Sequence, residues 1–164
     1  MTHDERTEKI ESYGRTFATL AAALKKFPQE MWQFRPAPKR WSIHEIIVHI
    51  ADAEANSYVR CRTFLAQPKH TVMVYNQDLW ATELKYHEQS VDDSLALFAL
   101  LRKMSYDLVK NLPDELWTKL TITHPESGIM TLEKWLIIYE HHVPAHIDQM
   151  SRNYDIWREH NRHE

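Results

Sequence analysis

The chain has 164 residues, 43% of them hydrophobic and 26% charged, a balance typical of one globular domain spanning residues 1–164. Its formal net charge is −3, with both signs mixed along the chain, which argues against a nucleic-acid partner and a membrane-binding basic segment. Gly14 and Gly128 are the only glycines, so a β-rich fold with many tight turns is disfavoured and helices are expected.

Three further features bear on location. No apolar stretch approaches the ~20 residues needed to span a bilayer. The first residues are polar and lack the apolar core of a signal peptide. Because Cys61 is the single cysteine, no intrachain disulfide can form, and we expect a reducing, cytoplasmic location.

Two amphipathic segments in the first half of the chain predict long helices. The first covers residues 4–26, where apolar side chains recur at helical spacing, and it ends before Pro28. The second covers residues 43–65. It begins after Ser42, which forms a capping-box pattern with Glu45 and so satisfies two free backbone N–H groups.

Two more helices are predicted in the second half. The third starts at Ser90 and stops before Pro113, and its apolar stripe again has helical spacing. The fourth starts after Thr131, a suitable N-cap. Pro144 lies inside this helix and removes one backbone donor, so we expect a kink or a bend there. Residues 155–164 are polar, and we expect them to form a frayed tail.

Four such helices predict an all-α four-helix bundle, with residues 70–89 as a long crossover between the second and third helices. A weak repeat supports this arrangement. Residues 27–32 (Phe-Pro-Gln-Glu-Met-Trp) resemble residues 112–117 (Leu-Pro-Asp-Glu-Leu-Trp), and each copy lies between a long helix and a Ser- or Thr-capped helix. If the two halves are built alike, the second helix lies beside the fourth.

The fourth helix carries the most informative pair, His142 and His146, which stand on one helical face because they are four residues apart. Two imidazoles on one face can bind one metal ion, although such pairs also occur by chance. His141 points about 100° away from His142 and is not expected to be a ligand.

The second helix contributes His49 at its middle. Taken alone, a histidine such as His49 is more often an ordinary, hydrogen-bonded core residue than a metal ligand. Its neighbours Glu45 and Asp52 are candidates for orienting the imidazole through its second nitrogen, although a capping acid and a solvated aspartate are the simpler readings. His44 is five residues from His49 and projects in a different direction.

Four short patterns, taken in order, resemble the DinB/YfiT-like superfamily of bacterial metal-binding helical bundles, and the similarity covers nearly the whole chain. They are Trp41-Ser-x-x-Glu45-x-x-x-His49-x-Ala51-Asp52-x-Glu54, Tyr75-x-x-x-x-Trp80-Ala81, His124-Pro125-Glu126-x-Gly128 and Tyr139-x-x-His142-x-x-x-His146-Ile147-x-Gln149. The resemblance implies a four-helix bundle of this type and a divalent-metal site made by His49, His142 and His146. It implies zinc or nickel as the ion, and a homodimer.

The same resemblance implies two kinds of enzyme. Some members transfer a low-molecular-weight thiol, such as bacillithiol, to a small electrophile; others are named metal-dependent hydrolases. Both chemistries need an open coordination position, which three histidine ligands leave on the ion. A thiol bound there is deprotonated, and a bound water becomes a hydroxide near neutral pH. Thiol transfer is the leading hypothesis, hydrolysis of a small amide or ester by metal-bound hydroxide is the alternative, and metal binding in a stress response without turnover is a third.

Several other residues are left without an assigned chemical role, and no catalytic residue beyond the metal ligands is predicted. Cys61 lies roughly 18 Å along the helix from His49, too far to share an ion. His124, Tyr75 and Trp80 could border the site or could simply pack. The remaining histidines are expected to face solvent: His3, His44, His70, His87, His160 and His163.

Overall fold

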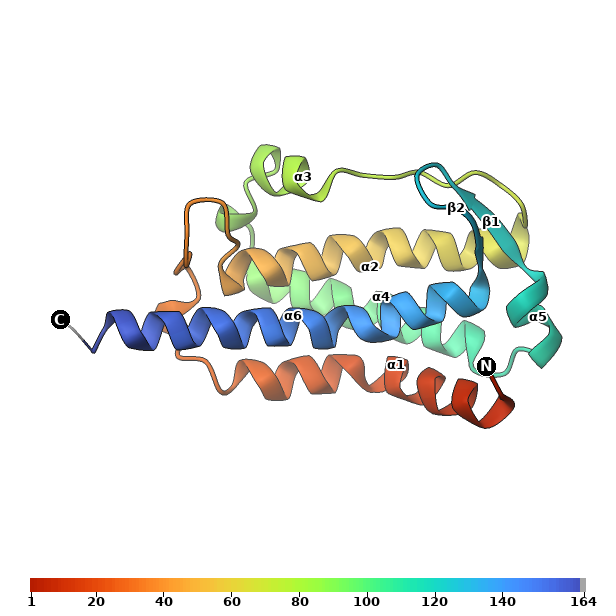
Figure 1. The fold of residues 1–164 in the computed structure, drawn as a ribbon, viewed down its shortest axis with the longest axis horizontal. Coiled ribbons are helices and arrows are strands. Elements are labelled where there is room, and N and C mark those ends of the chain that lie inside the picture. Colours follow the sequence, from red (N-terminus) through yellow and green to blue (C-terminus); the bar gives the residue numbers. More distant parts are fainter. Residues whose placement is uncertain (163–164) are drawn as a thin grey trace.

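Four long helices form the bundle that the apolar periodicity predicts (Figure 1). The computed structural model describes residues 1–162. The long helices are α1 (His3–Leu24), α2 (Ile43–Ala66), α4 (Val91–Val109) and α6 (Leu132–His160). Each begins after a hydroxyl side chain that accepts a hydrogen bond from a first-turn N–H, namely Thr2, Ser42, Ser90 and Thr131. The predicted all-α four-helix bundle is therefore confirmed.

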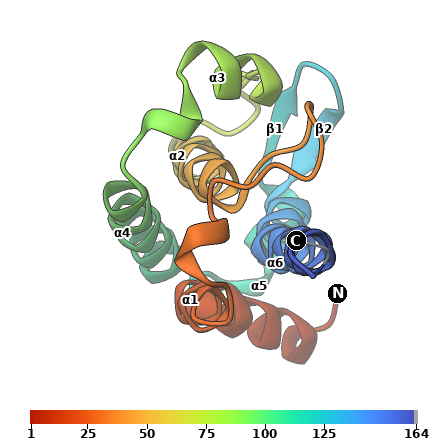
Figure 2. The ribbon, with the colours of Figure 1, turned by 90° about the vertical axis from the view of Figure 1, so that its left-hand side faces the viewer.

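Two pairs of long helices lie at opposite corners of this bundle, α1 with α2 and α4 with α6, whereas the consecutive helices α2 and α4 are neighbours. Seen from the end, α2 packs between α4 and α6, and α1 packs against the same two helices on the other side (Figure 2). Helices α1 and α6 run in one direction, while α2 and α4 run in the other (Figure 1). The predicted neighbours, the second and fourth long helices, are thus in contact and antiparallel as α2 and α6.

The connections contain short elements that the apolar periodicity did not reveal. The crossover after α2 holds α3 (Gln77–Glu83) and the 3₁₀ turn η2 (Tyr86–Glu88). A two-stranded hairpin, β1 (Thr121–His124) and β2 (Gly128–Thr131), precedes α6. Backbone bonds tie the start of the crossover to β1, with the Val72 N–H donating to the Thr123 carbonyl at 3.0 Å. The crossover therefore lies against α2 and the hairpin as a strap.

The repeated sequence pattern has a structural counterpart. Pro28 precedes the 3₁₀ turn η1 (Gln29–Met31), and Pro113 precedes α5 (Asp114–Lys119). Both prolines combine a φ near −57° with an extended ψ of 137° and 144°, respectively. A proline suits this position because its fixed φ matches a helix start and its missing N–H would be unpaired there.

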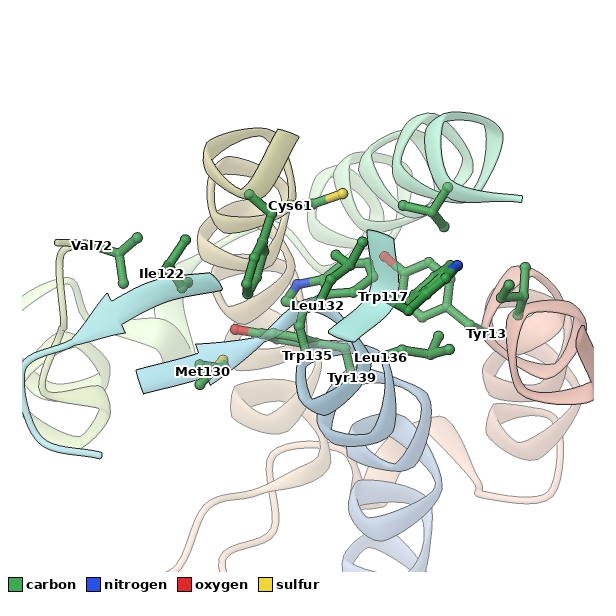
Figure 3. Close-up of a cluster of buried hydrophobic side chains, with 13 residues drawn as sticks. Tyr13, Cys61, Val72, Trp117, Ile122, Met130, Leu132, Trp135, Leu136 and Tyr139 are labelled. Atoms are coloured by element: carbon green, nitrogen blue, oxygen red, sulfur yellow. The ribbon is translucent and has the colours of Figure 1, made fainter. Parts of the chain in front are cut away.

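The end of the bundle near α5 and the hairpin is filled by a cluster of large apolar side chains (Figure 3). Trp117 and Trp135 are fully buried within it, and Ile122 and Met130 of the hairpin cover it. Burying one large apolar side chain contributes about 1.5–3 kcal/mol. A second cluster, built around Leu20, occupies the opposite part of the interior.

Helix α6 is not broken at Pro144. One expectation about its end needs correction: the helix continues to His160, so residues 155–160 are helical where a frayed tail was expected. Tyr154 stacks on Trp157 with centroids 6.1 Å apart, and both pack against the second apolar cluster. This packing stabilises a stretch that looks merely polar in sequence.

Candidate metal centre

His49 is placed by the first turns of α2. Ser42 and Glu45 form the predicted capping box: the Glu45 N–H donates to Ser42 Oγ at 3.2 Å, and the Ser42 N–H donates to Glu45 Oε2 at 2.9 Å. Arg35 also donates to the Glu45 carboxylate. This fixed helix start directs His49, one turn after Glu45, into the interface with α6, where only 2% of its surface is exposed.

His142 and His146 stand one turn apart on α6, as predicted. Their Nε2 atoms are 3.2 Å apart, and their ring centroids are 4.6 Å apart. Gln149 holds the outer nitrogen of His146, with 3.0 Å between Gln149 Oε1 and His146 Nδ1. Pro144, between the two histidines, does not prevent their side chains from meeting.

The bundle brings all three predicted ligands together. The His49 ring centroid is 5.3 Å from that of His142 and 4.9 Å from that of His146. One ring nitrogen from each residue lies within 4.8 Å of the others. In the described residues, 1–162, this is the single group of three or more potential metal-binding side chains.

Burial keeps these imidazoles neutral. It lowers the pKa of His49 to about 3, with a smaller contribution from His146. Burial also lowers the pKa of His142 well below its usual value. It lowers the pKa of His146 as well, although the hydrogen bond with Gln149 acts in the opposite direction. Neutral imidazole is the form that binds a metal ion, so the site is ready for one at neutral pH.

The nitrogen atoms themselves fit a metal ion. Within residues 1–162, the buried Nδ1 of His49 has no hydrogen-bond partner. A Zn–N bond is about 2.0–2.1 Å, which places two tetrahedral nitrogen ligands about 3.3 Å apart. The separation of the two Nε2 atoms on α6 matches this spacing. An unpartnered buried nitrogen beside a nitrogen pair at ligand spacing is what a three-histidine site requires.

The two carboxylates expected to orient His49 do not do so. Glu45 is bound to Arg35 and to the backbone of Ser42. Asp52 accepts a hydrogen bond from the Tyr86 hydroxyl at 2.5 Å. Neither carboxylate bonds to His49, because each has a stronger local partner on the crossover or at the helix start. Instead, the Trp41 ring covers His49 at a centroid distance of 4.7 Å.

Sequence reasoning missed a buried ion pair close to the site. Arg102 on α4 donates to Glu54 on α2 at 2.7 Å, and each side chain is 1% exposed. Arg102 also donates to the carbonyl of Tyr139, and Tyr13 donates to Glu54. The available signal was an arginine within the apolar stripe of α4.

The other residues considered from the sequence lie outside the three-histidine cluster. His141 is exposed, as predicted for a non-ligand, and Cys61 is buried in the cluster of Figure 3. His44 was expected to face solvent but is half-buried, with 2.8 Å between its Nε2 and the Gln89 carbonyl oxygen. His124 accepts from backbone N–H groups in its turn.

Among the histidines expected to face solvent, three are exposed: His70, His87 and His160. His3 is also exposed and lies 2.9 Å from an oxygen of Asp114. His163 lies outside the described residues.

Comparison with known proteins agrees with this architecture. A model of the DinB superfamily matches residues 12–150. A protein from Oceanobacillus iheyensis named "putative metal-dependent hydrolase" is 30% identical over 120 residues, covering 70% of this chain and 67% of the relative. A protein of the same name from Bacillus mycoides is 30% identical over 128 residues, covering 77% and 72%.

A solved structure shares the fold. YfiT from Bacillus subtilis, described as "a probable metal-dependent hydrolase with an unusual four-helix bundle topology", superposes with a TM-score of 0.85. The match covers 93% of this chain and 87% of YfiT at 23% identity. Among residues 1–162, no helix is both long and apolar enough to cross a membrane. The family match over most of the chain shows that this protein belongs to the DinB superfamily.

Proposed function

We propose that the protein is a metal-dependent enzyme in which His49, His142 and His146 hold one divalent ion, with zinc or nickel as the expected metal. The observation that carries this proposal is the convergence of three neutral imidazoles from two helices, with no fourth His, Cys, Asp or Glu in the group among residues 1–162. Closed structural zinc sites use four protein ligands, whereas three ligands are typical of catalytic sites.

The residues around the three histidines would shape such a site. Trp41 covers His49, and the Tyr139 ring lies edge-on to His142 at a centroid distance of 6.2 Å. These aromatic side chains exclude water from two sides of the cluster. The metal would supply positive charge that activates a thiol or a water molecule.

The carboxylates of α2 favour a thiol as the nucleophile. Glu45 is held by Arg35, Asp52 by Tyr86 and Glu54 by Arg102, so each already accepts a hydrogen bond or ion pair. Hydrolysis usually uses a protein base to take a proton from water. A thiol has a pKa of about 8.5 and loses its proton much more readily. We therefore infer transfer of a low-molecular-weight thiol to a small electrophile.

Hydrolysis of a small amide or ester is the second candidate. It is favoured by the names of the similar proteins from Oceanobacillus iheyensis and Bacillus mycoides. Asp52 could serve as its base, because burial raises the pKa of this carboxyl against the opposing bond from Tyr86. Asp52 lies one helical turn from His49 and shares its face of α2.

Metal analysis tests the site. His49→Ala and His142→Ala should each lose stoichiometric metal, while His141→Ala should retain it because His141 is exposed beside the site. Retention of full metal by both ligand variants would refute the three-histidine assignment.

Turnover assays separate the functions. Conjugation of a generic electrophile should require both the metal and an added thiol. Ester cleavage without thiol would instead support hydrolysis. If the metal-loaded protein showed neither activity, metal binding without turnover, as in a stress response, would be the better account.

We also propose that the protein acts in a reducing cytoplasm. We further propose that two copies of it pair through α4. The outer face of this helix exposes four large apolar side chains at helical spacing: Leu97, Leu100, Met104 and Leu108. The N-terminal turn of α4 is acidic, whereas Lys103 lies in its second half and Lys110 is its C-cap, both beside Asp107. An antiparallel pairing of two α4 helices would bring these opposite charges together. Leu100→Glu should convert a dimer to a monomer in sedimentation experiments, whereas Thr19→Glu, at an exposed position on α1, should not.

A further inference from the structure

Arg60, half-buried on α2, differs from the arginines that pair with carboxylates; half-buried Arg62 also has no carboxylate partner in residues 1–162, but it lies over the Tyr58 ring. Arg102 pairs with Glu54, Arg35 with Glu45, and Arg6 with Glu133 and Asp114. Arg60 donates instead to two neutral oxygens, the Tyr139 hydroxyl at 3.0 Å and the Met73 carbonyl at 3.1 Å. Within residues 1–162 it forms no ion pair, and its buried Nε has no acceptor.

This arrangement is unfavourable for a purely structural arginine. A partly buried charge is stable when a counter-charge compensates its lost hydration. A guanidinium has five N–H groups in a rigid fork, and those not bonded to Tyr139 or Met73 can receive a further acceptor. Arg60 is therefore held in place by neutral partners while its charge stays available.

A cavity lies beside this charge. It has a volume of about 500 Å³ and is lined by Arg60, Tyr75, Asn76, Gln77, His124 and Glu126. Its walls come from α2, the crossover strap and the β1–β2 turn, three segments that meet only in the folded protein. The lining is largely polar, and Arg60 is its permanent cation.

One buried side chain, Tyr139, contacts both Arg60 and a residue of the three-histidine cluster. The hydroxyl of Tyr139 accepts the bond from Arg60, and the ring of the same tyrosine lies against His142. Tyr139 therefore places Arg60 two side-chain contacts away from His142.

We propose that this cavity binds the carboxylate end of a small-molecule substrate, with Arg60 as the anion-binding residue. The inference rests on the proposed function only in calling the ligand a substrate; the binding site itself does not depend on the metal. Planar carboxylates match the guanidinium fork, and such charge-assisted bonds are stronger than neutral ones. A single cation suits one carboxylate better than a doubly charged phosphate.

Glu126 provides an internal check on this assignment. It is exposed at the cavity wall and is the one carboxylate among the lining residues. Its negative charge opposes an incoming anion. Removing the charge of Arg60 and removing that of Glu126 must therefore change anion binding in opposite directions.

The test is calorimetric titration of the full, metal-free chain with succinate and with its neutral analogue succinamide. Metal removal prevents succinate from binding an ion at the histidines. We expect succinate to bind at least tenfold more tightly than succinamide. Arg60→Gln should abolish this preference, Arg60→Lys should retain part of it, and Glu126→Gln should strengthen succinate binding about two- to fivefold.

Two controls address folding and position. Arg62→Gln removes a cation that lies over Tyr58, outside the cavity lining, and should leave succinate binding unchanged. Tyr139→Phe removes the neutral partner of Arg60 but keeps the charge, so selectivity for the anion should persist. Equal binding of succinate and succinamide by the wild type, or wild-type selectivity in Arg60→Gln, would overturn the proposal. Loss of metal-dependent activity with intact succinate binding would refute the proposed function alone.

Discussion

Two buried polar clusters lie inside the bundle, around Glu54 and His49, which are five residues apart on α2. They differ in how far the protein itself provides hydrogen-bond partners for their polar groups. Around Glu54, the carboxylate receives bonds from Arg102 and Tyr13, and Arg102 also bonds a backbone carbonyl. Around His49, three imidazoles face one another and the buried Nδ1 of His49 has no partner in residues 1–162. The first cluster is nearly satisfied by the protein itself, whereas the second is incomplete.

This difference separates a structural cluster from a binding site. Buried polar groups are normally hydrogen-bonded, and an unsatisfied one costs about 1–3 kcal/mol. A protein retains such a cost where a ligand removes it. The contrast predicts that changes in the Glu54 cluster affect folding, while changes in the histidine cluster affect metal binding.

The largest effect is expected when the ion pair is broken. Arg102→Met leaves the carboxylate of Glu54 buried without its counter-charge, which should reduce the free energy of unfolding by about 3–5 kcal/mol. Urea denaturation of the metal-free protein measures this loss. The double variant Glu54→Leu/Arg102→Met should recover most of it, because an apolar pair needs no compensation. A single variant as stable as the wild type would show that the pair is dispensable.

The second largest effect is expected from acid, which should lower the free energy of unfolding through the buried histidines. His49 has a pKa of about 3 in the folded protein, because of burial, and about 6.5 when unfolded. Between these values the unfolded chain binds more protons, so stability falls as the pH decreases from 6.5 towards 3 and is fully present above 6.5. Each such histidine contributes up to about 1.4 kcal/mol per pH unit. Denaturation at several pH values should show a smaller slope for His49→Leu; equal slopes would contradict the assignment.

A smaller loss is expected from Tyr13→Phe. The substitution removes the hydroxyl that donates to Glu54 at 2.9 Å but keeps the buried ring. Hydrogen bonds to charged groups contribute about 1.5–3 kcal/mol. Thermal denaturation should detect this loss while metal content stays at the wild-type level. Tyr106→Phe, which removes a hydroxyl bond to Glu11 nearer the surface, is the matched control and should cost less.

The smallest effect has the opposite sign. His49→Leu removes an imidazole whose buried Nδ1 has no hydrogen-bond partner within residues 1–162, so the metal-free protein should become about 1 kcal/mol more stable. Adding zinc should raise the melting temperature of the wild type but not of this variant. His141→Leu, on the exposed side, should preserve the zinc response. Destabilisation of metal-free His49→Leu would mean that His49 has a structural role.

Much of this fold is readable from local patterns. Apolar residues at helical spacing and hydroxyl N-caps locate α1, α2, α4 and α6, because both signals act within one or two helical turns. The hairpin was missed because the Gly128 turn and short strands are stabilised by contacts with Val72 and the apolar cluster. Residues 155–160 were misjudged because their apolar partners come from other segments.

The sequence alone determined the His142–His146 pair, since four-residue spacing on a helix fixes both side chains to one face. Resemblance to a family added His49. Only the tertiary structure decided that α2 lies against α6, that Glu45 and Asp52 are bound elsewhere, and that Arg60 stands without a carboxylate beside a cavity. Those outcomes depend on which segments meet after folding. A contact between residues distant in the chain is set by packing of the whole bundle, which no local pattern encodes.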